Sequence, residues 1–138
     1  MANVNMTQGL KNAGDRVSGV AGAVVAIGSM GFDDRATGFS TSDTAHNSGG
    51  APSNFIGKAL DATPTGGAAA SPYVVSHVAT LGTSDFTTPD KTVKRIALHF
   101  KATAPTVSDT TIGFGVDGLT LVKQTTFSLI TTFKLSYT

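Results

Sequence analysis

The sequence contains no cysteine and no tryptophan, and charged residues make up only 14% of its 138 residues. The absence of cysteine excludes disulfides, thiolate metal ligands and cysteine nucleophiles. Soluble domains usually carry about 25% charged residues, whereas this chain is rich in Thr, Ser, Gly and Ala. Such a composition is typical of β-rich proteins that pack into assemblies, and less typical of enzymes with charged clefts.

The sequence also has no excess of charge of either sign, since 10 basic residues balance 9 acidic ones. Nucleic-acid binding draws its affinity from a dense basic patch that releases phosphate counterions. We therefore predict no nucleic-acid partner. The densest basic stretch is expected to decorate one exposed strand edge, and it consists of Lys91, Lys94, Arg95 and Lys101.

Long apolar runs are missing as well. The most apolar run, residues 20–27, is far shorter than the roughly 20 residues that span a bilayer. Residues 1–19 lack the apolar core of a signal peptide. We expect a protein made in the cytoplasm, without a membrane partner.

The patterns that are present predict an all-β fold. The length fits one domain, and several short strands alternate with turns, which favours an antiparallel β-sandwich of jelly-roll or immunoglobulin-like type. We expect an extended N-terminal arm at residues 1–19, with at most a short helix near 6–16 capped by Asn5 or Thr7. Residues 20–138 are predicted to form a single sandwich domain.

Three longer strands are expected before residue 102. Residues 20–30 are apolar on both faces, and residues 73–81 form the second strand. Residues 92–101 alternate cleanly, which predicts a half-buried strand. Its inward face would carry Ile96, Leu98 and Phe100, and its outward face Arg95, Ala97, His99 and Lys101.

The clearest alternation lies at the end of the chain, and we predict that residues 126–138 form a strand that closes the sandwich. The Asp117-Gly118 pair favours a type I′ hairpin between strands at 111–116 and 119–123. The residues of the final strand that we expect in the core are Phe127, Leu129, Thr131, Phe133, Leu135 and Tyr137.

Residues 31–67 form a long irregular excursion. A stretch this polar is longer than normal loops, and we expect short strands near residues 38–41 and 54–60. Two interpretations stay open: the excursion reaches a neighbouring subunit, or it is an ordinary surface excursion.

The chain offers little catalytic or metal-binding chemistry. His77 and His99 could share a metal on adjacent strands, but Arg95 and Lys101 flank His99, so we predict one partly buried and one surface histidine. We assign no role to His46. Adjacent Asp33 and Asp34 are expected in a solvated turn. No phosphate loop or nucleophile elbow is present, so we predict no catalytic, cofactor-binding or metal residues, no cofactor and no enzyme.

Four segments resemble small virion proteins of tailed bacteriophages: Gly28-Ser29-Met30-Gly31, Ser42-Asp43-Thr44-Ala45, Lys94-Arg95-Ile96-Ala97-Leu98-His99, and Gly113 to Tyr137. The resemblance implies a self-assembling β-sandwich without catalytic residues.

It also implies a location on the capsid surface of the virion. The expected function is that of a capsid cement or decoration protein, a homotrimer that bridges and stabilises major capsid subunits. The alternatives are a tail, neck or fibre component that could bind a receptor, and a small lectin-like or hydrolytic module.

Overall fold

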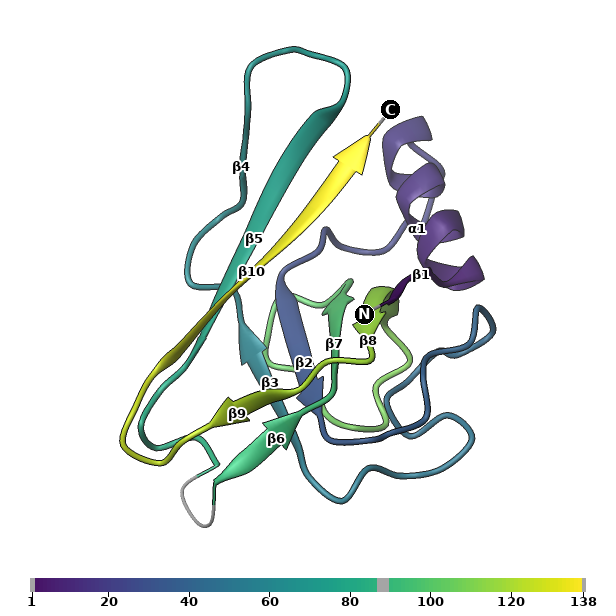
Figure 1. The fold of residues 1–138 in the computed structure, drawn as a ribbon. Helices are drawn as coiled ribbons and strands as arrows, with labels where there is room; N and C mark the ends of the chain where they lie inside the picture. The colour runs from purple at the N-terminus through teal and green to yellow at the C-terminus, as the bar shows by residue number, and fades with distance from the viewer. Residues whose placement is uncertain (1, 87–89, 138) are drawn as a thin grey trace.

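The computed structural model describes residues 2–86 and 90–137, and it is mostly β with one short helix (Figure 1). Residues 1 and 138, the outermost positions of the predicted arm and final strand, lie outside the described residues. In chain order the elements are β1 (Ala2–Asn5), α1 (Thr7–Ser18), β2 (Ser29–Asp33), β3 (Phe55–Ala59), β4 (Thr65–Gly66), β5 (Tyr73–Leu81), β6 (Lys91–Val93), β7 (Arg95–His99), β8 (Ile112–Asp117), β9 (Leu121–Lys123) and β10 (Leu129–Tyr137).

These strands form three antiparallel sheets, none of them closed. The large sheet has the order β1-β8-β7-β2-β3, the second sheet β10-β5-β4, and the third β6-β9. The predicted mostly-β, antiparallel character is confirmed. The predicted strand at 73–81 coincides with β5, and the one near 54–60 is β3. No strand forms at 38–41.

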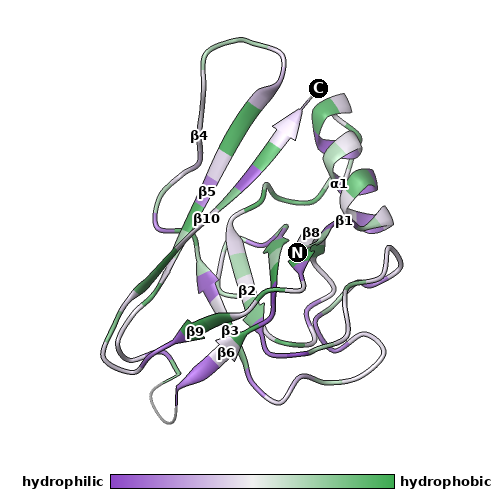
Figure 2. Cartoon of the chain, in the orientation of Figure 1, coloured by the Kyte–Doolittle hydropathy of each residue, from purple (hydrophilic) through white to green (hydrophobic). Residues whose placement is uncertain are grey.

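The main core lies where apolar side chains of the sheets meet. Met30, Leu98 and Phe114 come from the large sheet, and Leu81 and Phe133 come from the second sheet. Figure 2 shows hydrophobic stretches on the strands that border this core, including β8. A fully buried side chain of this size contributes about 1.5–3 kcal/mol through desolvation, so this core is the main source of stability.

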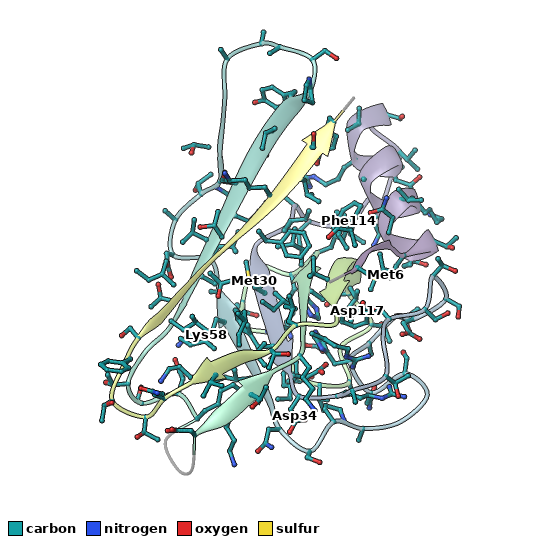
Figure 3. The ribbon with its side chains drawn as sticks, in the orientation of Figure 1. Met6, Met30, Asp34, Lys58, Phe114 and Asp117 are labelled. Atoms are coloured by element: carbon teal, nitrogen blue, oxygen red, sulfur yellow. The ribbon has the colours of Figure 1, made fainter. Side chains whose placement is uncertain are left out.

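The N-terminal segment does not extend as an arm, because it packs on the large sheet. β1 pairs with β8, and Met6, which follows β1, is completely buried beside α1 (Figure 3). The helix approaches β8 so closely that a Cβ on Gly9 would collide with the backbone of Gly113. Residues 2–18 therefore supply contacts that the sheet itself needs.

The short helix predicted near residues 6–16 is confirmed as α1, but its predicted caps are wrong. Met6 occupies the N-cap position, without a side-chain hydrogen bond. The helix ends at Gly19, which has a φ of 69° and adopts the left-handed conformation that glycine tolerates best. In the described parts of the chain, no helix combines the length and apolar character that a membrane crossing requires.

The strand predicted at residues 20–30 is wrong except for its end. β2 starts only at Ser29, and Val20 to Gly28 run as turns and irregular chain. Gly22 has a φ of 76°, a conformation outside the β region. The apolar residues here, such as Val24 and Ile27, pack against the core from the side without strand pairing.

The strand predicted at residues 92–101 is divided between two sheets. β6 pairs with β9 and β7 pairs with β2 and β8. Every residue of β7 is buried, so the half-buried expectation is wrong, and Arg95 is not part of an exposed basic edge. The reason is a second layer over the large sheet: residues 34–54, hereafter the cover segment, which carry the buried residues Phe39, Ala45 and His46.

The predicted Asp117-Gly118 hairpin is also wrong. Gly118 has a positive φ of 67°, as a tight turn needs, but the flanking strands belong to different sheets. The Leu119 N–H donates to the Lys94 carbonyl at 3.0 Å. This bond draws the chain toward β6, so β9 pairs there and not with β8.

The final strand is confirmed as β10, although it is shorter than expected. It pairs with β5 over nine residue pairs, with Phe133 opposite His77. Side chains alternate in exposure and Phe133 is buried. Two of its predicted core residues are wrong: Phe127 precedes β10 and is 63% exposed, and Tyr137 is 50% exposed.

Candidate functional site

A row of small residues crosses the face of the large sheet that lies under the cover segment. Gly31 on β2 is opposite Ala97 on β7, and Ala97 is opposite Gly115 on β8. A Cβ on Gly31 would collide with His46 and His99, and one on Gly115 would collide with Phe39. The row therefore forms a trough that holds rings from the cover segment.

A buried ion pair lies beside this trough. Asp33 and Arg95 are opposite each other on β2 and β7, and their side chains are 0% and 1% exposed. Arg95 Nε donates to Asp33 Oδ1 at 2.9 Å and Nη2 donates to Oδ2 at 2.7 Å. Two parallel bonds of this kind fix both position and orientation.

Arg95 also holds the cover segment. Its Nη2 donates to the His46 carbonyl at 2.7 Å, and its Nη1 donates to the Thr37 carbonyl at 3.4 Å. The guanidinium carbon lies 4.2 Å from the centre of the Phe39 ring, where a cation is attracted to the ring face. The backbone N–H of Phe39 donates to Asp117 Oδ2 at 2.7 Å.

A line of hydrogen bonds, hereafter the histidine chain, continues from the ion pair through Asp33, His46, His99 and Thr111. The Asp33 carboxylate accepts from His46 Nδ1 at 2.5 Å. His46 Nε2 and His99 Nε2 are 3.0 Å apart, and His99 Nδ1 and Thr111 Oγ1 are 2.9 Å apart.

Each tautomer in this chain follows from the one before. A carboxylate only accepts hydrogen bonds, so His46 carries its proton on Nδ1 and accepts at Nε2. His99 must then donate from Nε2, which leaves its Nδ1 to accept from the Thr111 hydroxyl. All four polar groups are satisfied when both imidazoles are neutral.

The surroundings favour this neutral state of the imidazoles. Burial lowers the pKa of His46, although Asp33 acts in the opposite direction. Burial lowers the pKa of His99 to about 3, and His46 and Lys101 act in the same direction. Burial alone would raise the pKa of Asp33, but hydrogen bonds from His46 and Arg95 more than offset it and keep the carboxylate ionised.

The structure corrects two predictions about these residues. Asp33 lies within β2 and is completely buried, so only Asp34 resembles the predicted turn residue, with its carboxylate accepting from the side chain of Asn54 at 2.6 Å. His99 is completely buried and not on the surface. His77 lies on β5 in the other sheet, where its Nδ1 donates to the Phe133 carbonyl at 3.1 Å.

The buried groups contact protein on all sides, so the histidine chain links the large sheet to the cover segment and has a structural role. Asp33, His46 and His99 are all 0% exposed, so none of the three contacts a substrate in this conformation. Across residues 2–86 and 90–137, no three His, Cys, Asp or Glu side chains gather as a metal site would require.

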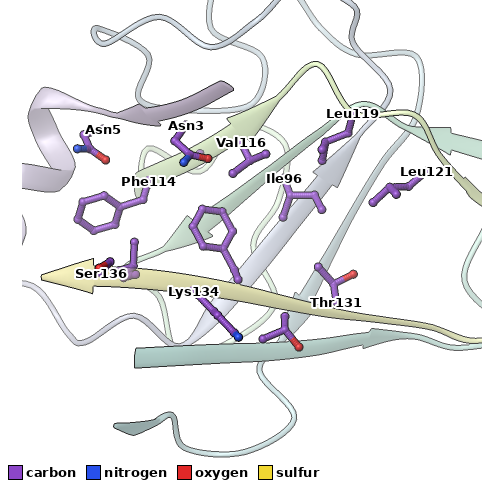
Figure 4. Close-up of a pocket in the computed structure, with 14 residues that line it drawn as sticks. Asn3, Asn5, Ile96, Phe114, Val116, Leu119, Leu121, Thr131, Lys134 and Ser136 are labelled. Carbon is purple, nitrogen blue, oxygen red and sulfur yellow. The ribbon is translucent and has the colours of Figure 1, made fainter. Parts of the chain in front are cut away.

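The surface that can receive a partner lies on the opposite face of the large sheet. A groove of about 570 Å³ runs between β10 and the strands β1 and β8 (Figure 4). Its lining includes the buried residues Ile96 and Phe114 together with Leu119. Polar residues at its margin include Asn5 and Lys134.

Two sheet edges border this groove. β1 lies at one end of the large sheet and β10 at one end of the second sheet, so each has a partner strand on one side only among the described residues. Both strands contribute lining residues, such as Asn3 and Ser136. An edge with open N–H and C=O groups beside an apolar groove can accept an extended peptide as an added strand.

One group in the groove wall suggests a test of stability. Thr131 Oγ1 is buried without a hydrogen-bond partner in the described residues. Because an unsatisfied buried hydroxyl is unfavourable by about 1–3 kcal/mol, Thr131→Val is expected to raise the free energy of unfolding by about 1 kcal/mol. Urea unfolding measures this, with the exposed neighbour Thr132→Val as the control, expected to change stability by less than about 0.5 kcal/mol. A loss of stability in T131V would contradict the assignment.

Sequence reasoning missed both features of this site. His46 sits in a segment without periodicity, and the groove depends on how two distant strands approach. One signal was present: the small residues Gly31, Ala97 and Gly115 lie mid-strand, where side chains normally pack, and their absence indicates a close neighbour. No protein-family model matches the chain, and neither does any curated protein or solved structure.

Proposed function

We propose that the chain is a structural protein of a tailed-phage virion, a capsid cement or decoration protein on the capsid surface. It binds an extended segment of a major capsid subunit in the groove between β1 and β10, and three copies bridge neighbouring subunits. The antiparallel sheets belong to an open β-sandwich of jelly-roll or immunoglobulin-like type.

One observation carries the proposal: an apolar groove bordered by two sheet edges. An incoming strand would gain backbone hydrogen bonds from an edge, and its alternate side chains would bury apolar surface in the groove. The edge of β10 alone is nine residues long, or about 30 Å at 3.3 Å per residue. A neutral sequence with few charges suits such a surface, because it adds little desolvation penalty.

The expected contacts differ from those suggested by sequence alone. Residues 2–18 pack on their own sheet, and the cover segment lies over the face of that sheet that is opposite the groove. Neither is extended toward a neighbour in this conformation, so the groove replaces them as the proposed contact. The exposed apolar residue Ile130 on β10, which is 68% exposed, gives a copy of the chain a further surface for trimer contacts.

A pair of neighbouring residues on β9 tests the groove. Leu121 lines the groove, whereas Val122, the next residue, does not, and the two are 36% and 54% exposed. We expect Leu121→Glu to lower the binding of purified chain to shells assembled without it by about tenfold or more, since a charge desolvated in an apolar groove is unfavourable by over 1.4 kcal/mol. Val122→Glu is the matched control and is expected to bind like the wild type.

Copies bound per shell are measured by gel densitometry, and light scattering of the purified chain gives its oligomeric state. Hundreds of copies per particle fit a capsid protein. About a dozen copies or fewer, located at the tail by cryo-EM, would overturn the proposed location. Equal binding by L121E and V122E would overturn the role of the groove.

A further inference from the structure

The histidine chain joins two separate parts of the molecule. Asp33 and His99 belong to β2 and β7 of the large sheet, while His46 belongs to the cover segment. The two imidazoles lie almost parallel, with an interplanar angle of 10° and centroids 5.1 Å apart. The bond between their Nε2 atoms is therefore a contact between the cover segment and the sheet.

The hydrogen-bond geometry limits how many protons this contact can hold. With one added proton, His46 can donate from both nitrogens if His99 shifts its own proton to Nδ1 and Thr111 becomes an acceptor. A second proton places an N–H on each Nε2, and two donors then face each other across 3.0 Å. Two positive imidazoles cannot keep this arrangement.

The neighbouring carboxylates offset the second positive charge only in part, since Asp33 raises the pKa of His46 and Asp109 that of His99, but burial outweighs both. Asp33 on β2 is already paired with Arg95 on β7, and the guanidinium of Arg35 is bound to the Ser48 carbonyl. Asp109 is paired with Lys101 near His99. Asp117 on β8 accepts from the Phe39 backbone. The available carboxylates are therefore already engaged with other donors.

We propose that the histidine chain is an acid-sensitive link between the cover segment and the large sheet. When both imidazoles become charged, the link breaks and the cover segment leaves the sheet, while β5 and β10 stay paired. Release exposes the trough and the buried residues beneath it. This inference does not depend on the proposed function, since it concerns the opposite face of the sheet from the groove.

The direction of the pH effect follows from linkage. Burial lowers the pKa of His46 and His99 in the closed form, whereas in the open form each returns toward about 6.5. Below pH 6.5 the open form binds protons that the closed form does not bind. The closed form therefore has its full stability above this pH, and it loses stability relative to the open form as the pH falls. Between pH 7.5 and 5.0 His99, whose pKa in the closed form is about 3, contributes about 30-fold to the opening equilibrium, and His46 adds a further factor in the same direction.

Amide hydrogen exchange tests the proposal, with each rate divided by its intrinsic rate at the same pH. The reporters are amides that hold the cover segment, such as Phe39 N–H and Asn47 N–H, which donates to the Val107 carbonyl at 3.2 Å. We expect their protection to fall by at least 30-fold from pH 7.5 to 5.0, and by more than that of the β5 amides.

His99→Gln tests the role of the chain, because a glutamine amide can donate to His46 and accept from Thr111 but cannot take up a proton. We expect H99Q to lose at least 10-fold of the acid response. His77→Gln is the control, since His77 is also buried with a lowered pKa, but it lies in the other sheet. H77Q should keep the full response of the cover segment.

Three outcomes would overturn the proposal. The cover segment could keep its protection at pH 5.0, it could open only together with β5 and β10, or H99Q could respond to acid as strongly as the wild type. If H99Q does not fold, the comparison of cover segment with β5 in wild type and H77Q decides between release and global unfolding.

Discussion

Replacing Arg95 by alanine is expected to lower the free energy of unfolding by about 3–5 kcal/mol, the usual effect of removing one partner of a buried ion pair. Asp33 would keep its charge at 0% exposure, with only His46 and the Arg35 backbone as donors. The carbonyls of His46 and Thr37 would lose their donor as well. A loss of this size is a large part of the 5–15 kcal/mol that typically stabilises a domain.

Arg35→Ala is the matched control for this substitution. The Arg35 side chain is partly exposed and donates to the Ser48 carbonyl, so we expect a loss of about 1 kcal/mol. Urea unfolding of both variants, fitted with a common m-value, gives the two differences. Similar losses in R95A and R35A would show that the buried pair carries no special weight.

Gly9→Ala is expected to destabilise the protein by about 2–3 kcal/mol, although alanine is the better helix former. A Cβ at Gly9 would collide with the backbone of Gly113, and backbone cannot move aside as a flexible side chain can. Overpacking of this kind is unfavourable by about 1–3 kcal/mol, occasionally more. The helix would have to leave β8, taking Met6 partly out of the core.

Gly14→Ala in the same helix is the control. A Cβ there meets nothing within 4 Å, so helix propensity alone acts and we expect a gain of up to about 1 kcal/mol. Thermal unfolding of the two variants should therefore shift in opposite directions. If both alanines stabilise, the close approach of α1 to β8 is wrong.

The sequence predictions are most accurate for the strands that have one exposed face. β5 was predicted with its correct bounds, and the alternation of β10 is confirmed. A sheet with one solvated face imposes a period of two on its residues. β7 is buried on both faces, so its polar residues Arg95 and His99 looked like a solvent-facing set although they face the cover segment.

The buried site could not be derived from local pattern. Asp33 and Arg95 are 62 residues apart in sequence, and nothing nearby indicates their pairing. Because Asp33 is followed directly by Asp34, its sequence context indicates a solvated turn. The packing of the N-terminal segment likewise has no continuous apolar face to indicate it, since it depends on the pairing of β1 with β8 and on the contacts of Met6 and Gly9.

The opposite cross-strand placement of Asp33 and Arg95 has a consequence for how the chain avoids misfolding. If β2 slipped by one residue against β7, every β2 side chain would change faces. Asp33 would then enter the apolar core beside Ile96, and Phe32 would lie among the polar groups of the trough, with Arg95 left unpaired. A slipped register would therefore be unfavourable on both faces of the sheet, so the ion pair and the core together specify the register of β2 against β7.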